Sequence, residues 1–485
     1  METSAPDSYP PSLVELLEGA FKETAETPTS QKRLRLASQA DKELPGIPPD
    51  ELLNDPFIQL ALNRLLKSLK NVFLNKVTGA AVGVQDDNDS CKISTSPSEE
   101  EKGCANQVLV EKALVELSSL TNYTWEQLNI GHWKSVPRIW RKLYTCLAIL
   151  KVCFLVLKRS SDIEVIKECD MGILMGEPIC QNVLSKIAEE ISSRISISAN
   201  PKVNCNDNTN HEVMTMTPTT SEQEKVDLVE RGKVVLKNKS SNEFEVTLAK
   251  KPSLQEFLSF MNTETPALLS DTINHWPALN KWNVEYIHRV AGFRTVPVEV
   301  GQKYTSEDWT QKVMTIDEFI NKYMKPSTEI KCPDDIGYVA QYHLFRQLPE
   351  LGKDIRVPEY CTLGSISDNE NVEINAWFGP ADTISPTHYD PNHNILVQIF
   401  GSKIIRLFPP SESSKLKPHP ESSLLFNTSQ LDVEQDDLFV AHPEMKNAKH
   451  CDIILNAGEA LYIPPKWWHY VKSLEPSFSV SFWFE

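Results

Sequence analysis

The feature that most constrains the fold is a change of apolar periodicity about halfway along the 485-residue chain. Before it, apolar residues recur at the 3.6-residue spacing of amphipathic helices, in segments 12–23, 56–77, 106–121, 136–157 and 181–195. After residue 336, short apolar runs alternate with turn signals such as "FGSK" and "NAGE". The pattern predicts an α+β multidomain protein, in which an all-α helical N-terminal domain precedes a β-sandwich or barrel.

Composition shifts suggest where these domains begin and end. We predict a helical N-terminal domain over 1–196, a polar linker over 197–226 and a β-rich domain over 227–485. A polar insertion rich in Asp, Ser and Glu lies near 79–103 of the helical domain. The sequence shows no repeat of strict period. The helical half is therefore predicted to be a scaffold or docking domain without chemistry of its own.

Charge and cysteine usage exclude several classes of protein. A formal charge of −17 argues against nonspecific nucleic-acid binding and suits basic peptide partners. The ten cysteines form no CxxC pair, so a zinc ribbon is not supported. The N-terminus has no basic stretch followed by an apolar core, and the apolar run 146–157 is interrupted by Lys151. We therefore expect no signal peptide and no membrane association.

A candidate metal site lies in the last hundred residues. His388 and Asp390 form an H-x-D pair at the end of 373–387, which reads as one strand. Two imidazoles and one carboxylate are the ligand set of non-haem Fe(II) oxygenases, although an H-x-D triplet is also a common polar turn. The third ligand must come from a distant strand. The candidates are His393, His419, His442, His450 and His469, and we choose His469 because it begins an aromatic-rich strand after a Pro-Pro turn.

Lys403 lies 15 residues after His388, on the strand that follows "IFGS". A lysine directed into an apolar barrel is costly without an anionic partner. A dicarboxylate co-substrate would supply that partner. The alternative is a solvent-facing lysine in a hairpin turn.

Residues 256–485 resemble a known family. The stretches "EINAWFGP", "ISPTHYDPNHNILVQIFGSKIIRLFPP", "GEALYIPPKWWHYVKSL" and "SFSVSFWF" are similar to the JmjC family of Fe(II)- and 2-oxoglutarate-dependent oxygenases. The resemblance implies a double-stranded β-helix, which is a jelly-roll, cupin-like fold. It also implies Fe(II), 2-oxoglutarate and O₂ as metal and co-substrates.

The resemblance assigns roles to individual residues. His388, Asp390 and His469 would bind the iron. Tyr338 and Lys403 would hold the distal carboxylate of 2-oxoglutarate, and Ser385 and Asn394 would add hydrogen bonds to it. Trp377 and Glu299 would contact the substrate, the alternatives being a core aromatic and a solvent-facing strand glutamate.

Two kinds of substrate chemistry stay open. The resemblance implies decarboxylation of 2-oxoglutarate to succinate and CO₂, coupled either to C3 hydroxylation of protein arginine or to demethylation of histone H3 lysine 36. Histone-tail cleavage is a further possibility. A carboxylate such as Glu299 suits a guanidinium, and an aromatic such as Trp377 can lie against its plane, so we favour arginine. The alternatives of another class are a non-catalytic cupin-like binding module and a metal-dependent hydrolase.

Partners and location follow from the same reading. We expect basic protein or peptide substrates, histone tails among them, and no direct nucleic-acid binding. The 16 residues after His469 leave no room for a C-terminal helical dimerisation unit, so a monomer is predicted. The resemblance implies a nuclear protein, present in the cytoplasm as well, with a role in chromatin regulation and the cell cycle.

Overall fold

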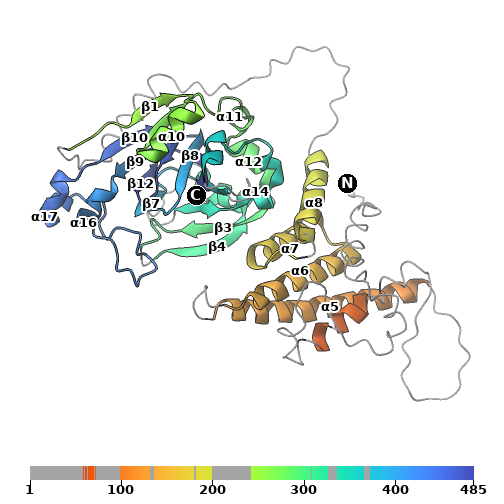
Figure 1. Ribbon diagram of the computed structural model, residues 1–485. Coiled ribbons are helices and arrows are strands. Elements are labelled where there is room, and N and C mark those ends of the chain that lie inside the picture. The colour runs from red at the N-terminus through yellow and green to blue at the C-terminus, as the bar shows by residue number, and fades with distance from the viewer. Residues whose placement is uncertain are drawn as a thin grey trace, which may run out of the picture. The chain divides into compact units, whose positions relative to one another are not determined.

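The computed structural model divides into two units (Figure 1). One contains residues up to Pro201 together with Phe293–Thr295, and the other contains Lys202–Gly292 and Val296–Glu485. The predicted linker over 197–226, which sets the domain boundaries, lies mostly in 199–241, outside the described residues, so these boundaries stay predictions. The predicted helix 12–23 also lies outside the described residues. The structure describes eleven positions between 58 and 72, then 99–130, 136–179, 182–198, 242–306, 308–325, 336–364 and 372–485.

The N-terminal unit is helical, as the 3.6-residue spacing predicts. Its buried apolar side chains form one core, in which Leu117, Leu147 and Ile187 are fully buried. Residues 99–103, predicted to end the polar insertion, instead belong to the first helix described in full. The four helices described in full are α5 (Glu99–Leu128), α6 (Arg138–Lys158), α7 (Asp162–Met175) and α8 (Val183–Ser198).

Helix α7 is absent from the predicted helices. Ser161 caps it, and the Glu164 side chain accepts a hydrogen bond from the Ser161 backbone in return, which is a capping box. Gly172 obscured the helical pattern. A Cβ there would lie 2.7 Å from the Ala148 Cβ and 2.4 Å from a Leu184 methyl carbon, so this glycine allows neighbouring helices to pack closely.

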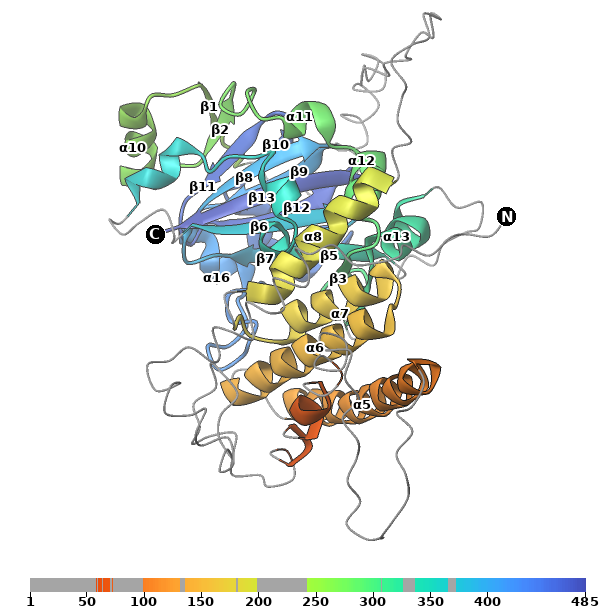
Figure 2. The same cartoon turned by 90° about the vertical axis from the view of Figure 1, so that its right-hand side faces the viewer.

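The C-terminal unit is built on two β-sheets, which confirms the predicted β-rich fold. The larger sheet has the strand order β1-β2-β11-β8-β13-β6-β5-β3-β4, and the smaller has the order β10-β9-β12-β7. Figure 2 shows β11, β8, β13 and β6 side by side. The strands are β1 (Thr247–Lys250), β2 (Ala267–Ser270), β3 (Thr295–Val300), β4 (Thr310–Thr315), β5 (Gly337–Tyr342), β6 (Glu373–Gly379), β7 (Ile384–Tyr389), β8 (His393–Phe400), β9 (Lys403–Phe408), β10 (Cys451–Leu455), β11 (Ala460–Ile463), β12 (Trp468–Ser473) and β13 (Ser477–Phe484).

The two sheets pack face to face. One apolar cluster joins Leu396 and Leu461 of the larger sheet to Ile405, Leu455 and Val471 of the smaller. Side chains from both sheets thus fill one interior, as in a jelly roll of the cupin type.

Short helices surround the sheets. Phe257 of α10 and Ile287 of α12 are fully buried in the core that contains Phe378 and Val397 of the larger sheet. Among the described residues, no helix is both long enough and apolar enough to cross a membrane. The helices of this unit are α10 (Leu254–Asn262), α11 (Ala278–Lys281), α12 (Val284–Ala291), α13 (Ile316–Phe319) with the π-helical turn Ile320–Met324, α14 (Leu344–Gln347), α15 (Pro349–Gly352), α16 (Ser413–Leu416) and α17 (Leu438–Ala441).

The single strand predicted over 373–387 is wrong. The stretch forms two strands, β6 and β7, which belong to different sheets. The turn between them contains Asp382 in the left-handed region, with φ of 66°. The Asp382 N–H donates to the Ser473 carbonyl at 2.9 Å. This turn carries the chain from the larger sheet to the smaller, so the H-x-D pair lies beside β12 instead of continuing β6.

Candidate active site

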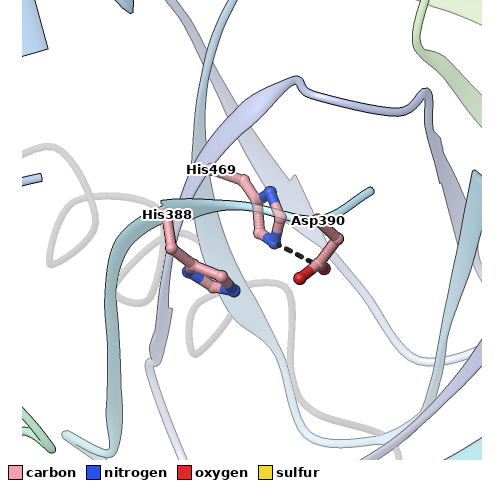
Figure 3. Close-up of side chains that lie close together, drawn as sticks. All are labelled: His388, Asp390 and His469. Carbon is pink, nitrogen blue, oxygen red and sulfur yellow. Dashed lines mark ion pairs between the residues drawn. The ribbon is translucent and has the colours of Figure 1, made fainter. Parts of the chain in front are cut away.

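Three predicted ligands meet where β7 pairs with β12. His388 and His469 are direct cross-strand partners, and Asp390 follows the last residue of β7. The ring centroids of the two histidines are 4.2 Å apart, and His469 Nε2 lies 3.5 Å from Asp390 Oδ2. Figure 3 shows the three side chains converging from the two strands. One ligand atom from each lies within 4.8 Å of the others, as a shared metal ion requires.

Backbone carbonyls orient both rings. His388 Nδ1 lies 2.7 Å from the Pro386 oxygen, and His469 Nδ1 lies 3.0 Å from the Trp467 oxygen. A carbonyl only accepts, so each Nδ1 carries the proton and each Nε2 carries a lone pair. This tautomer is the one a histidine needs to bind a metal through Nε2.

The charge states suit a cation. Burial, together with the nearby His469, lowers the pKa of His388 to about 4, so its imidazole is neutral at neutral pH. Burial acts to raise the pKa of Asp390, but the two nearby histidines, His469 foremost, hold it below its ordinary value. The cluster therefore offers two imidazoles, of which that of His388 is neutral at neutral pH, and one carboxylate.

A small pocket surrounds the cluster. Eight of the nine predicted site residues line it, and Glu299 is the exception. Four further lining residues were not predicted, three of them apolar. The lining residues are Tyr338, Trp377, Ser385, His388, Asp390, Asn394, Leu396, Lys403, Ile463, His469, Val471 and Ser481.

Lys403 is buried in this pocket with 1% of its surface exposed. Its Nζ donates to Tyr338 Oη at 3.0 Å. Burial lowers the pKa of Lys403 to about 7, and among the described residues no carboxylate pairs with it. The alternative of a solvent-facing lysine is thus wrong, and the ammonium still lacks the anion that would justify its burial.

The pocket also contains a buried polar atom that lacks a hydrogen-bond partner. Asn394 Oδ1 is buried and has no hydrogen-bond partner within the described chain. Ser385 lines the same wall and is 9% exposed. The Trp377 indole N–H donates to Ser481 Oγ at 2.9 Å, which fixes the indole plane at the pocket wall. Buried groups without partners are costly and indicate a polar ligand.

Glu299 lies one strand away from the pocket. It is the cross-strand partner of Tyr338, and its charge helps to raise the pKa of that tyrosine. Burial raises the pKa of Glu299 itself to about 7. Trp309 Nε1 donates to Glu299 Oε2 at 3.3 Å. Trp309 is absent from the predicted site residues, and its place ten residues after Glu299 was the available signal.

The other candidate third ligands lie elsewhere. His393 contacts Tyr462 Oη at 2.8 Å, His419 lines a different cavity, and His442 lies beside Glu444. His450 forms a second cluster with Glu243 and Asp452. Both oxygens of that aspartate already accept from Arg406, at 2.6 and 2.7 Å, which makes this cluster the poorer metal site.

The residues present fit iron and 2-oxoglutarate. The two Nε2 lone pairs and the Asp390 carboxylate match the facial triad of non-haem iron. The buried Lys403 ammonium and the Tyr338 hydroxyl match a carboxylate, and Asn394 and Ser385 offer further polar contacts nearby.

Comparison with known proteins agrees with this geometry. The Cupin-like domain family matches residues 253–485, and the family "KDM8-like, N-terminal ARM repeats" matches 115–205. "Lysine-specific demethylase 8" of Danio rerio is 40% identical over 75% of this chain and 86% of its own length. The protein of the same name from Xenopus tropicalis is 38% identical over 76% of this chain and 88% of its own.

A third relative has a different name. "Jumonji C domain-containing protein 5" of Drosophila melanogaster is 36% identical over 76% of this chain and 86% of its own length. Matches of this extent confirm the resemblance read from the sequence, the fold class and the metal and co-substrates. The chain belongs to the JmjC family of Fe(II)- and 2-oxoglutarate-dependent oxygenases, close to JmjC domain-containing protein 5, also called lysine-specific demethylase 8.

Proposed function

We propose that this oxygenase hydroxylates C3 of arginine in protein substrates, with release of succinate and CO₂. His388, Asp390 and His469 hold the iron in this proposal. Tyr338, Ser385, Asn394 and Lys403 bind 2-oxoglutarate, and Glu299 and Trp377 contact the substrate. Eight of these residues line one pocket, and Glu299 lies on the strand next to Tyr338, which supports these roles.

The protein's part is to bind, orient and exclude water. Bound iron supplies the oxidation of a substrate carbon by O₂ at the expense of 2-oxoglutarate. The backbone carbonyls hold the two imidazoles as Nδ1–H tautomers. Lys403 Nζ and Tyr338 Oη would donate hydrogen bonds to the distal carboxylate of 2-oxoglutarate, which gives the buried ammonium a counter-ion. The indole of Trp377, fixed by Ser481, narrows the space in which a substrate carbon can lie.

The observation that carries the choice of arginine is the carboxyl group of Glu299. Its only hydrogen-bond donor among the described side chains is the Trp309 indole, and burial raises its pKa to about 7. A guanidinium would ionise this carboxyl group and could bind it through two parallel hydrogen bonds. In this proposal the indole of Trp377, at the pocket wall, lies against the guanidinium plane.

Replacing Glu299 tests the assignment. Glu299→Ala should lower kcat/KM for an arginine peptide about 100-fold, because it removes a charge-assisted pair. Peptide-independent succinate release should stay near the wild-type rate, since the iron and 2-oxoglutarate residues are intact. Glu285→Ala, on the exposed face of α12, is the matched control. A variant that turns over the arginine peptide like the wild type would contradict the role of Glu299.

The pH profile gives a second readout of the same residue. Glu299 must be ionised to bind a cation, and burial holds its pKa near 7 in the free protein. We therefore expect kcat/KM for the peptide to fall as pH drops below about 7. Glu299→Gln should flatten this acid limb, whereas peptide-independent turnover should keep its own profile.

A second candidate is lysine demethylation, which the names of the zebrafish and frog relatives favour. Glu299 could pair with an ammonium as well. Mass spectrometry of arginine and methyl-lysine peptides separates the chemistries. A gain of one oxygen on arginine supports hydroxylation, loss of methyl from lysine supports demethylation, and a shortened peptide supports cleavage. Absence of iron- and 2-oxoglutarate-dependent turnover on every basic peptide would contradict hydroxylation and demethylation, and absence of any shortened peptide would contradict cleavage.

Nuclear action, chromatin regulation and a role in the cell cycle are part of this proposal, as is a monomeric state. The names of the demethylase relatives support action on proteins. Analytical ultracentrifugation of the full chain tests the monomer.

A further inference from the structure

A second cavity lies on the other side of strand β7. Its volume is about 410 Å³, which is within the usual range of ligand sites. Pro386 and Thr387 of β7 and Tyr470 of β12 form its floor. We call this cavity the side groove. It is lined by Lys303, Thr305, Ser306, Pro386, Thr387, His419, Ser429, Gln430, Leu431, Asp432, Val433 and Tyr470.

The side groove and the metal pocket share a strand. Thr387 lines the groove, and the next residue, His388, lines the pocket. β7 is the edge strand of the smaller sheet. A chain bound at the metal could therefore pass over this edge and reach the groove within a few residues.

One wall of the groove is fastened to the edge of β7. Ser429 N donates to the Thr387 carbonyl at 2.8 Å, and His388 forms an isolated β-bridge with Thr428. The Asn427 side chain donates to the Tyr389 carbonyl at 2.9 Å. Ser429 thus lines the groove, and residues 427–429 are bound to the same strand that carries His388.

The opposite wall is tied to the first. Lys303 forms an ion pair with Asp432, and Tyr304 Oη lies 3.2 Å from Thr428 Oγ1. Burial raises the pKa of Tyr304 to about 12, and the charges of Asp390 and Glu299 add to this effect. Tyr304 therefore stands between pocket and groove, while its neighbours Lys303 and Thr305 line the groove.

The chemistry of the groove indicates a polar, cationic chain as its occupant. Thr387 Oγ1 is buried, with the residue 2% exposed, and has no hydrogen-bond partner in the described chain. A peptide group is a suitable partner for such a hydroxyl. The segment from 419 to 445, which supplies one wall, has no Lys or Arg and carries six carboxylates, of which Asp432 lines the groove.

We propose that the side groove binds a basic segment of the substrate polypeptide that flanks the residue oxidised at the metal. This inference rests on the proposed action on protein substrates, and it adds a recognition site outside the metal pocket. The groove selects substrates by their flanking sequence, whereas the pocket selects the residue that is oxidised.

Filling the groove tests the proposal. Ser306 is an exposed lining residue, and Ser306→Trp should occupy part of the groove without touching the metal pocket. Ser422→Trp makes the same change at an exposed residue outside the lining. The probes are a fluorescent Lys- and Arg-rich peptide with a central arginine, the same peptide with Glu in the flanks, and N-acetylarginine amide.

We expect Ser306→Trp to weaken binding of the long basic peptide at least tenfold in fluorescence anisotropy. Ser422→Trp should bind it like the wild type. Turnover of N-acetylarginine amide and peptide-independent succinate release should be unchanged in both variants. Thr387→Val, which keeps the side-chain shape, should weaken the long peptide about three- to tenfold by removing one hydrogen bond.

Equal affinity of Ser306→Trp and the wild type for the long peptide would overturn the inference. Equal binding of the Glu-flanked peptide by the wild type would do the same. Because binding is measured without turnover, the two proposals fail separately. If no peptide is oxidised but the groove variants lose the basic peptide, the oxygenation of arginine fails and the groove stands.

Discussion

At the residue scale, His388 and His469 keep their Nε2 lone pairs for a metal that Asp390 would also bind, because backbone carbonyl groups accept from their Nδ1–H groups. His469→Ala removes one of these lone pairs, and we expect Fe(II) affinity to fall by more than about 100-fold, beyond the effect of losing an outer-shell partner. Isothermal titration with Mn(II) and metal analysis of the loaded protein measure this. His442→Ala, outside the cluster, is the control. Equal metal binding by both variants would contradict the ligand set.

Lys403 gives the pocket a pH dependence. Burial lowers its pKa from 10.5 to about 7 in the folded protein. Between these values the unfolded chain carries a proton that the folded chain lacks, so stability rises with pH across this window. Below pH 7 Lys403 is protonated in both the folded and the unfolded state, so the folded protein bears the full free-energy cost of burying the charge.

Lys403→Met keeps the length of the side chain and removes the amine. Without 2-oxoglutarate, we expect this variant to unfold at a higher urea concentration than the wild type at pH 7, and the difference to shrink toward pH 10. Affinity for 2-oxoglutarate should fall about 10- to 100-fold, because a charge-assisted hydrogen bond is lost. Parallel urea profiles for the two proteins across this pH range would contradict the buried-amine account.

At the element scale, the β8–β9 hairpin places Lys403. Gly401 in its turn has φ of 72°, and a Cβ there would lie 2.4 Å from the Pro476 carbonyl oxygen. Gly458, between β10 and β11, has φ of 87° but no heavy atom within 4 Å of a built Cβ. We expect Gly458→Ala to cost about 1–2 kcal/mol of stability, through backbone strain alone.

Gly401→Ala adds a clash to the same strain, and we expect it to cost about 2–4 kcal/mol. It should also weaken 2-oxoglutarate binding, since Lys403 lies two residues further on. Urea unfolding and co-substrate titration of the two glycine variants measure both effects. Identical losses in the two variants would show that the Pro476 contact does not constrain the hairpin.

The sequence predicted most strands of the C-terminal unit because each combines a short apolar run with a turn signal. It failed at 373–387, where the apolar pattern continues through the turn at Asp382 and gives no sign that the chain changes sheets. The prediction also failed at α7, where a glycine, Gly172, allows neighbouring helices to pack closely. A single sequence does not show that this glycine belongs to a helix.

The H-x-D pair, His469 and Lys403 could be predicted from their own chemistry and spacing. The remaining polar and aromatic pocket residues were predicted from the family resemblance, and Leu396, Ile463 and Val471 look like any core residue. Ser481 becomes informative only through its contact with Trp377. The position of Glu299 beside the pocket could not be read from the sequence, because its pairing with Tyr338 depends on strand register and not on sequence distance.

At the scale of the whole molecule, the helical half is related to ARM repeats although its sequence has no strict period. Degenerate repeats conserve a packing pattern more than particular residues, so a single chain hides them. Among the described residues of the helical half, no cluster of metal ligands is present. The role of a scaffold or docking domain stays a prediction.

The overall charge of −17 acts oppositely on the two small partners of the site. It attracts a basic peptide and repels the 2-oxoglutarate dianion, and salt screens both effects. Raising the ionic strength from about 20 mM to about 500 mM should therefore lower kcat/KM for a basic peptide roughly tenfold or more. Over the same range the KM for 2-oxoglutarate should hold constant or fall. A neutral-flanked arginine peptide is the control, and an equal loss with both peptides would show that the field of the protein does not guide the substrate.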